Sequence, residues 1–312
     1  MKVKSRLFVA VDIVYILMMI LPVLAGIILR VLTKPLAEGI VISGAQIYFT
    51  LDTPIQSLPI TESQVNSLLV MISITGLCLF LTHGLSVKST LKRQHFAEFI
   101  VEKVEGMVVE NMGEYFSNFT PFIVGMLALS GFSSLLSLFG LFPPTSDLNV
   151  VSGWAVLVFI LITYYKFKCG PIQYLKGFAE PVKFMAPLNL ISEIATPISM
   201  AFRHYGNVLS GAVISVLVAA GLQGVSSMVL GKLPGFIGEI PLLQIGLPAV
   251  LSMYFDVFSG CLQAYIFATL TMLYVAGGFP ADEYFRRKAK KDEKKKSREA
   301  KKELNYRRNL KC

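Results

Sequence analysis

Long apolar stretches alternate with short polar segments along most of this chain. Each stretch has about 20 residues or more, which is enough for an α-helix to cross about 30 Å of hydrocarbon. The stretches span residues 7–32, 65–85, 119–142, 150–167, 187–224 and 241–279. This pattern predicts an all-α polytopic membrane protein with about six membrane helices.

The last two stretches are longer than a membrane requires. At 1.5 Å per residue, a helix of about 40 residues is over 50 Å long, so it must tilt steeply or break to stay in the bilayer. Pro197, Pro241 and Pro248 are positions where these helices can bend. We expect two long, strongly tilted helices that present a broad surface to another component of the membrane.

The polar segments between the stretches indicate their orientation. The basic loops "KSTLKRQ" (88–94) and "KFKCGPIQYLKG" (166–177) are expected inside, and "TLDTPIQSLPITES" (50–63) is expected outside. Both termini are then cytoplasmic. The first apolar stretch follows a basic start but is long and lacks a small-residue cleavage site, which favours a retained anchor over a signal peptide. Residues 96–116 show helical spacing of apolar residues and glutamates, typical of an amphipathic helix at the membrane surface.

Composition agrees with a membrane location. Of the 312 residues, 54% are hydrophobic and 16% are charged, whereas soluble domains carry about 25% charged residues. The net charge of +9 comes mainly from the tail after residue 285. Beside a membrane helix, this tail is better explained as a cytoplasmic segment near anionic lipid than as a nucleic-acid site. The four cysteines and three histidines are scattered, so we expect no metal site and no disulfide framework. No cofactor is expected either.

One segment, "SMAFRHYGNVLSG" (199–211), places Arg203 near the middle of a long apolar stretch. An ionisable group at this depth is costly and is a functional candidate that needs a partner. A salt bridge inside the chain, to Glu193 or Asp256, is one possibility. A partner on another molecule is the other.

Polar and small residues recur around Arg203 at helical spacing. Positions three and four residues apart share a face of a helix, and the set on this face is Thr196, Ser199, Arg203, Asn207 and Ser210. Small hydroxyl residues also mediate ordinary packing of membrane helices, which is the simpler explanation for Thr196 and Ser210.

The last apolar stretch carries a second polar pair. Asp256 and Gln263 are seven residues apart, which puts them two turns apart on one face of an α-helix. A carboxylate and an amide along an apolar helix can bind and relay a proton through water, although Gln263 could also be only an interhelical hydrogen-bonding group. Together with Arg203, this pair suggests an ion pathway.

The chain resembles a known family in three segments. "PLNLISEIATPISMAFRHYGNVLSG" (187–211), "FDVFSGCLQAYIFATLTMLYV" (255–275) and "PTSDLNV" (144–150) are similar to subunit a of the membrane sector of bacterial F-type ATP synthase. The resemblance covers about residues 47–280. Residues 1–46 are then an extra anchor with the start of an external loop, and residues 281–312 are a basic cytoplasmic tail.

The resemblance implies a stator subunit in the plasma membrane with two offset half-channels for protons, or for sodium ions. Its implied partners are the c-ring rotor subunits, subunit b of the peripheral stalk and other ATP synthase subunits. The chain has no phosphate loop, so ATP chemistry belongs to other subunits. An unrelated channel or secondary transporter, with Arg203 binding an anionic substrate, is the alternative.

The resemblance also assigns roles to the polar residues. Arg203 would be the stator arginine that gates the rotor carboxylate, with Asn207 and Gln263 beside it. Asp256 would lie in the outside-facing half-channel and Asp147 at its mouth. The residues implied for the cytoplasm-facing half-channel are Glu193 and Ser199.

Three departures from the family pattern concern the outer half-channel. Ala212 stands where relatives often have an acidic residue or histidine. His204 and Tyr205 replace the usual Leu–Phe pair after the arginine, and Asp256 is shorter than the more frequent glutamate.

Overall fold

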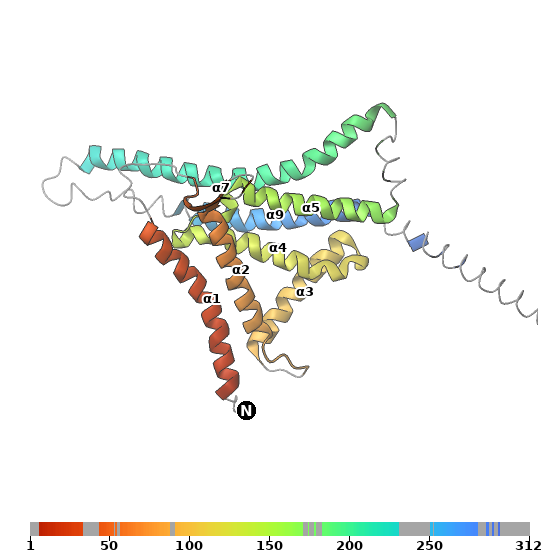
Figure 1. Cartoon of the computed structure of the whole chain (residues 1–312), viewed down its shortest axis with the longest axis horizontal. Helices are drawn as coiled ribbons and strands as arrows, with labels where there is room; N and C mark the ends of the chain where they lie inside the picture. Colours follow the sequence, from red (N-terminus) through yellow and green to blue (C-terminus); the bar gives the residue numbers. More distant parts are fainter. Residues whose placement is uncertain are drawn as a thin grey trace, which may run out of the picture.

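The computed structural model consists mainly of long α-helices (Figure 1). It describes residues 6–33, 44–52, 54, 57–87, 91–170, 174, 178, 183–230, 250–251, 253–279, 285–286, 289 and 293. Within these ranges six helical segments are long and apolar enough to cross a membrane: Phe8–Thr33, Glu62–Thr82, Glu114–Phe139, Leu148–Lys168, Ala186–Ser226 and Tyr254–Gly277. The expectation of an all-α polytopic membrane protein is confirmed.

The helices follow the apolar pattern closely. The α-helices are α1 (Arg6–Thr33), α2 (Glu62–Thr82), α3 (Lys92–Met112), α4 (Thr120–Leu135), α5 (Leu148–Cys169), α7 (Ala186–Leu230) and α9 (Gly260–Gly277). Short 3₁₀ turns are η1 (Glu114–Phe119), η2 (Leu136–Phe139), η3 (Pro144–Ser146) and η4 (Lys183–Met185), and η6 (Tyr254–Ser259) is a π-helical turn. The expected amphipathic segment at 96–116 is largely α3.

The segment expected as an external loop contains a small β-hairpin. Strands β1 (Ile47–Asp52) and β2 (Ser57–Thr61) pair antiparallel, with Leu51 opposite Leu58. The polar composition of this segment did not indicate strands. Thr61 then begins α2 through a capping box with Gln64, the signature by which a helix start is recognised in a sequence.

The main core is built from α3, α4, α5, α7 and α9, together with η1. It is formed by fully buried aliphatic and aromatic side chains from all five helices, including Val108, Ile123, Val158, Met200 and Phe267. Burial of apolar area is the main stabilising contribution inside such a core. The core holds α7 and α9 beside α4 and α5.

Helix α1 packs along α2 and is fixed near its amino-terminal end by a buried ionic cluster. Asp12 accepts hydrogen bonds from Arg93 Nη1 at 2.7 Å, and its carboxylate lies 2.8 Å from His83 Nδ1. Phe8 stacks on the His83 ring at 4.3 Å. The first apolar segment is thus tied to the loop between α2 and α3.

Helix α7 is the longest element, with 45 residues. Figure 1 shows that it changes direction along its length, and Pro197 lies inside it. Because proline removes an i→i−4 hydrogen bond, a bend there is expected. The second long stretch is helical from Tyr254 to Gly277, and most of its beginning, 241–249, lies outside the described residues together with most of the basic tail.

Candidate functional site

Arg203 is exposed on the outer face of α7. Its sequence neighbours Ala201 and His204 are buried against the bundle, with 3% and 0% of their surfaces exposed. Ser199, Gly206 and Ser210 are exposed like Arg203, and they follow one another at spacings of three or four residues, so they share its face. We call these four residues the arginine stripe.

The Arg203 guanidinium makes no hydrogen bond or ion pair with any other residue that the structure describes. A guanidinium remains protonated under all ordinary conditions. A permanent charge in the middle of a 41-residue apolar span is therefore presented outward, away from the chain's own core.

Glu193, one of the two candidate partners of Arg203, is engaged elsewhere. It accepts hydrogen bonds from Lys166 Nζ at 2.8 Å and from the Tyr174 hydroxyl at 2.9 Å. Its side chain is 10% exposed. Ten residues along a helix correspond to about 15 Å, which separates Glu193 from Arg203. The salt bridge between Glu193 and Arg203 considered from the sequence is not formed.

The Glu193 site is a small pocket in which polar side chains meet apolar ones. Burial raises the pKa of the Tyr174 phenol to about 12, and its hydrogen bond to Glu193 acts in the same direction. Lys166, Glu193, Thr196 and Tyr274 line a cavity of about 190 Å³ at this point. The sequence did not single out Lys166 or Tyr174, since each looked like part of a basic loop.

Asn207 joins α7 to η6, the turn that precedes α9. Its amide nitrogen donates to Ser259 Oγ at 2.9 Å. Gln263 follows Ser259 by one helical turn and is buried, with 3% of its surface exposed. A Cβ on Gly211 would lie 3.0 Å from the Phe255 side chain, so α7 approaches η6 closely here. The structure therefore brings Asn207 and the helix of Gln263 together, with Ser259 as a contact that sequence reasoning missed.

Asp256 lies within the π-helical turn η6 and is half-buried. A π turn has more residues per turn than an α-helix and often marks a functional site. The regular α-helical spacing that placed Asp256 and Gln263 on one face therefore does not hold across this segment. Asp256 still occupies the helix that faces α7, one residue after Phe255, whose side chain is the one close to Gly211.

Asp147 is the N-cap of α5 and belongs to a polar cluster at one end of the bundle. It accepts hydrogen bonds from the Asn149 backbone N–H at 2.9 Å and from the Ser63 hydroxyl. The neighbouring Glu62 is 3% exposed and pairs with Arg30 at 3.2 Å. Asn66 donates to the Phe142 carbonyl at 2.8 Å.

The sequence identified only Asp147 in this cluster. Glu62 and Ser63 were assigned to a loop, although the Thr61–Gln64 capping box could have placed them in the first turn of a helix. The cluster combines two buried or half-buried carboxylates at the start of two membrane segments. Burial also raises the pKa of the nearby Tyr48 phenol, with the Glu62 charge as the second cause.

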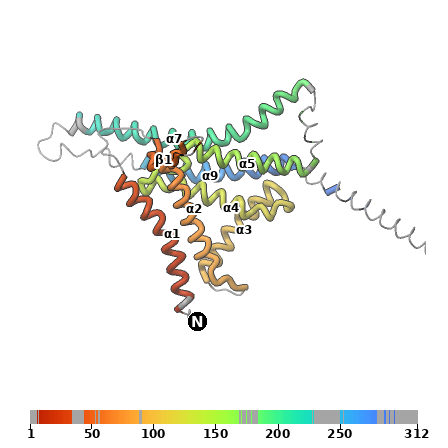
Figure 2. The backbone as a smooth tube through the Cα atoms, viewed as in Figure 1, coloured from red at the N-terminus to blue at the C-terminus, as the bar shows by residue number. Residues whose placement is uncertain are grey.

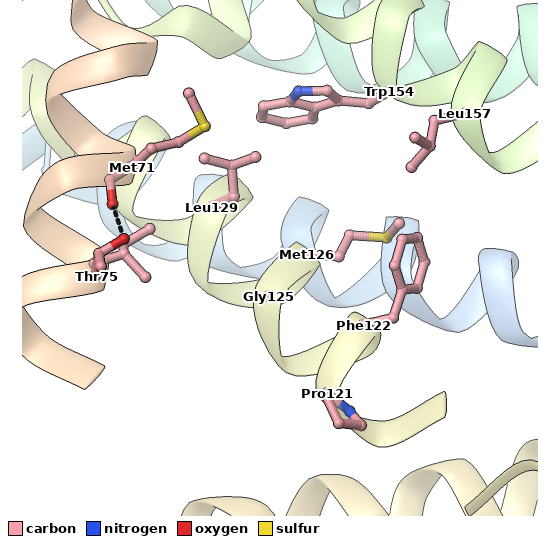
Figure 3. Close-up of a pocket in the computed structure, with 10 residues that line it drawn as sticks. Met71, Thr75, Pro121, Phe122, Gly125, Met126, Leu129, Trp154 and Leu157 are labelled. Atoms are coloured by element: carbon pink, nitrogen blue, oxygen red, sulfur yellow. Dashed lines mark hydrogen bonds between the residues drawn. The ribbon is translucent and has the colours of Figure 1, made fainter. Parts of the chain in front are cut away.

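A separate groove between α2, α4 and α5 is apolar (Figure 3). Its volume is about 410 Å³, and it is lined by Met71, Phe122, Met126, Leu129 and Trp154, among others. The hydroxyl of Thr75 on its wall donates to the Met71 carbonyl at 2.8 Å, so it is satisfied within its own helix. The groove offers no polar group that would carry an ion.

No group of three or more histidine, cysteine, aspartate or glutamate side chains suited to a metal ion occurs within the described part of the chain. Most of the polar site residues predicted from the sequence instead fall into three places: the cluster around Asp147, the seam between α7 and η6, and the Glu193 pocket. Arg203 lies on α7 between Glu193 and Asn207.

Comparison with known proteins gives one consistent result. The family model described as ATP synthase A chain matches residues 65–276. ATP synthase subunit a of Legionella pneumophila strain Philadelphia 1 is 27% identical over 231 residues, which cover 73% of this chain and 91% of that protein. The corresponding protein of Priestia megaterium is 30% identical over 243 residues, covering 73% and 97%. That of Desulforamulus reducens is 34% identical over 198 residues, covering 62% and 70%.

Proposed function

Because this chain belongs to the ATP synthase A chain family, we propose that its arginine stripe faces the c-ring and that Arg203 gates the rotor carboxylates. The family is that of the membrane-sector stator subunit that takes part in proton translocation, and other ATP synthase subunits are its partners. Family membership favours this function over an unrelated channel or secondary transporter.

One observation carries the proposal. Arg203 is charged, exposed and without an ion pair among the described residues, in the middle of an apolar span. A charge at membrane depth needs a counter-charge. A rotor carboxylate that passes the stripe supplies it, and the small side chains of Ser199, Gly206 and Ser210 leave room for a close approach.

Electrostatics then give the gating step. At about 4 Å and an effective dielectric constant of about 20, an ion pair gains about 4 kcal/mol. This favours the ionised carboxylate by about a thousandfold. A rotor carboxyl group therefore releases its proton on reaching Arg203 and binds another after passing it. The fixed cation also repels a proton that would cross directly between the two half-channels.

The polar sets on either side of Arg203 serve as the two half-channels. The Asp147 cluster and Asp256 form the path from the outside, and the Glu193 pocket with Ser199 forms the path to the cytoplasm. Asn207 and Gln263 line the seam next to Arg203. The basic loops support this orientation, with both termini cytoplasmic and the protein in the plasma membrane. Subunit b of the peripheral stalk holds the stator in place.

The domain organisation completes the proposal. Residues 47–280 form the ion-channel domain, residues 1–46 add an anchor helix with the start of the external loop, and residues 281–312 form a basic tail that contacts anionic lipid. The anchor packs along α2, remote from the arginine stripe.

The test is ATP-driven proton pumping by the assembled complex in membrane vesicles. Arg203→Ala should abolish pumping, and Arg203→Lys should restore little of it because a desolvated ammonium can lose its proton. Lys103→Ala, which removes an exposed charge on α3, serves as the matched control and should pump normally. Normal pumping by Arg203→Ala would show that the gate lies elsewhere.

A further inference from the structure

His204, the residue after Arg203, is buried completely. None of its surface is exposed, and it points into the bundle while Arg203 points outward. Its Nε2 lies 3.4 Å from the Ser130 hydroxyl on α4. Its Nδ1 has no hydrogen-bond partner among the described residues. A buried polar atom without a partner is costly and calls for an explanation.

The ring is held by aromatic neighbours. Trp154 of α5 and Phe267 of α9 each meet the imidazole edge-to-face, with ring centroids at 5.9 Å and 5.5 Å. These contacts fix the plane of the ring and surround it with apolar surface. Only the two ring nitrogens can form hydrogen bonds, and Nδ1 forms none with the described residues.

A line of buried hydroxyl groups leads away from His204. The Ser134 hydroxyl donates to the Ser130 carbonyl at 3.1 Å, and its oxygen lies 3.5 Å from the Thr145 hydroxyl. Ser130, Ser134 and Thr145 are all buried, with at most 3% of their surfaces exposed. We call these three residues and His204 the hydroxyl–histidine column.

The far end of the column meets the polar cluster of Asp147. Thr145 lies in η3, two residues before Asp147. The Asp147 carboxylate accepts a hydrogen bond from the Ser63 hydroxyl. Ser133 adds a further buried hydroxyl on α4 without a partner in the described part of the chain. Elements α7, α4 and η3 thus place buried polar side chains one after another in an otherwise apolar core, with side-chain contacts between His204 and Ser130 and between Ser134 and Thr145.

We propose that His204 is a proton-relay residue, which receives protons through the hydroxyl–histidine column and passes them to the seam beside Arg203. This inference rests on the proposed function. In the relay step Nε2 accepts a proton from the Ser130 hydroxyl while Nδ1 releases its own proton to a water molecule that would connect it to the seam. The ring keeps its number of protons and becomes the other tautomer, and it must turn to present a bare nitrogen to Ser130 again before the next transfer. A hydroxyl can donate and accept at once, which lets Ser130 and Ser134 serve as intermediate sites once the Ser134 hydroxyl turns from the Ser130 carbonyl and a water molecule joins the two hydroxyls.

The experiment measures ATP-driven proton pumping by the assembled complex in liposomes. His204→Gln keeps a polar side chain but removes the pair of exchanging nitrogens, and it should lower pumping at least tenfold. Thr271→Val is the matched control, because it removes a buried hydroxyl that donates to its own helix at Phe267 and otherwise contacts only the Met126 sulfur, outside the column. Pumping by His204→Gln at the rate of Thr271→Val would overturn the proposal, whereas loss of pumping by Arg203→Ala would leave the proposed function intact.

Chemical rescue separates a relay from a packing role. In His204→Ala, added imidazole should restore pumping, since a free imidazole can exchange protons at the vacated position; failure of this rescue in an assembled complex would count against the relay. If the His204 variants do not assemble, Ser130→Ala decides. Reduced pumping supports the column, and full pumping overturns it.

Discussion

At the scale of single residues, α7 carries two charged groups with opposite surroundings. Glu193 is partly buried and bonded to Lys166 and Tyr174. Arg203 is exposed and makes no ion pair with the described residues. A paired carboxylate contributes to the structure of the chain, while an unpaired guanidinium is available to a passing partner.

The Tyr174 hydroxyl gives a pH-dependent signal for the Glu193 pocket. The native phenol has a pKa near 12, against 10.0 for a free one. The stability that the protonated group contributes is therefore complete below pH 10 and is lost as the pH rises toward 12. The difference in phenolate absorbance between the wild-type complex and Tyr174→Phe should be absent at pH 10 to 11. A difference that develops near pH 10 would show that the phenol is solvated and not bound to Glu193.

At the scale of helices and strands, the apolar pattern predicted most of the fold. Each of the six apolar stretches overlaps one of the membrane helices, because length and hydropathy largely decide whether a segment can span a bilayer. The hairpin of β1 and β2 was missed because its two short strands lack a clear alternation of apolar and polar residues. The π turn at Asp256 was missed because the spacing argument assumed regular α-helical geometry across residues 254–259.

The same limit applies to the candidate site. Arg203 was found because a charge in an apolar stretch is conspicuous in a sequence. The burial of His204 and the ion pair between Glu193 and Lys166 depend on contacts between residues far apart in the chain, which spacing does not reveal. Ser130, Ser134 and Thr145 resemble ordinary helix-packing residues until their neighbours are known.

Close helix packing gives a prediction for α1. A Cβ added to Gly76 of α2 would lie 2.9 Å from the Met19 nitrogen and 3.0 Å from the Met18 carbonyl carbon of α1. Because backbone atoms cannot move aside easily, Gly76→Ala should cost about 1–3 kcal/mol and loosen α1. We expect faster proteolysis of α1 in the purified complex and a lower Tm as the measurable signs of this loosening.

Gly153→Ala in α5 is the control for this substitution, since its added Cβ meets nothing within 4 Å and alanine favours helix. Equal proteolysis rates for the Gly76→Ala and Gly153→Ala variants would mean that α1 does not pack tightly on α2.

At the scale of the whole molecule, the outer face of α7 is the surface that we propose faces the rotor. Figure 2 shows α7 along one side of the bundle, with α5 and α9 beneath it. The buried residues of α7 hold it to the core, and the arginine stripe faces away from them. The rotor carboxylate on this surface would complete the charge pair for which Arg203 has no partner among the described residues.

Cross-linking of the arginine stripe to the rotor tests this claim most directly. Gly206→Cys, in a chain whose four cysteines are replaced by serine, should form a disulfide with a cysteine placed next to the rotor carboxylate. The link should stop ATP hydrolysis coupled to rotation, and reduction should restore it. Gly153→Cys on α5 should not react. Cross-linking of Gly206→Cys no greater than that of Gly153→Cys would contradict the account.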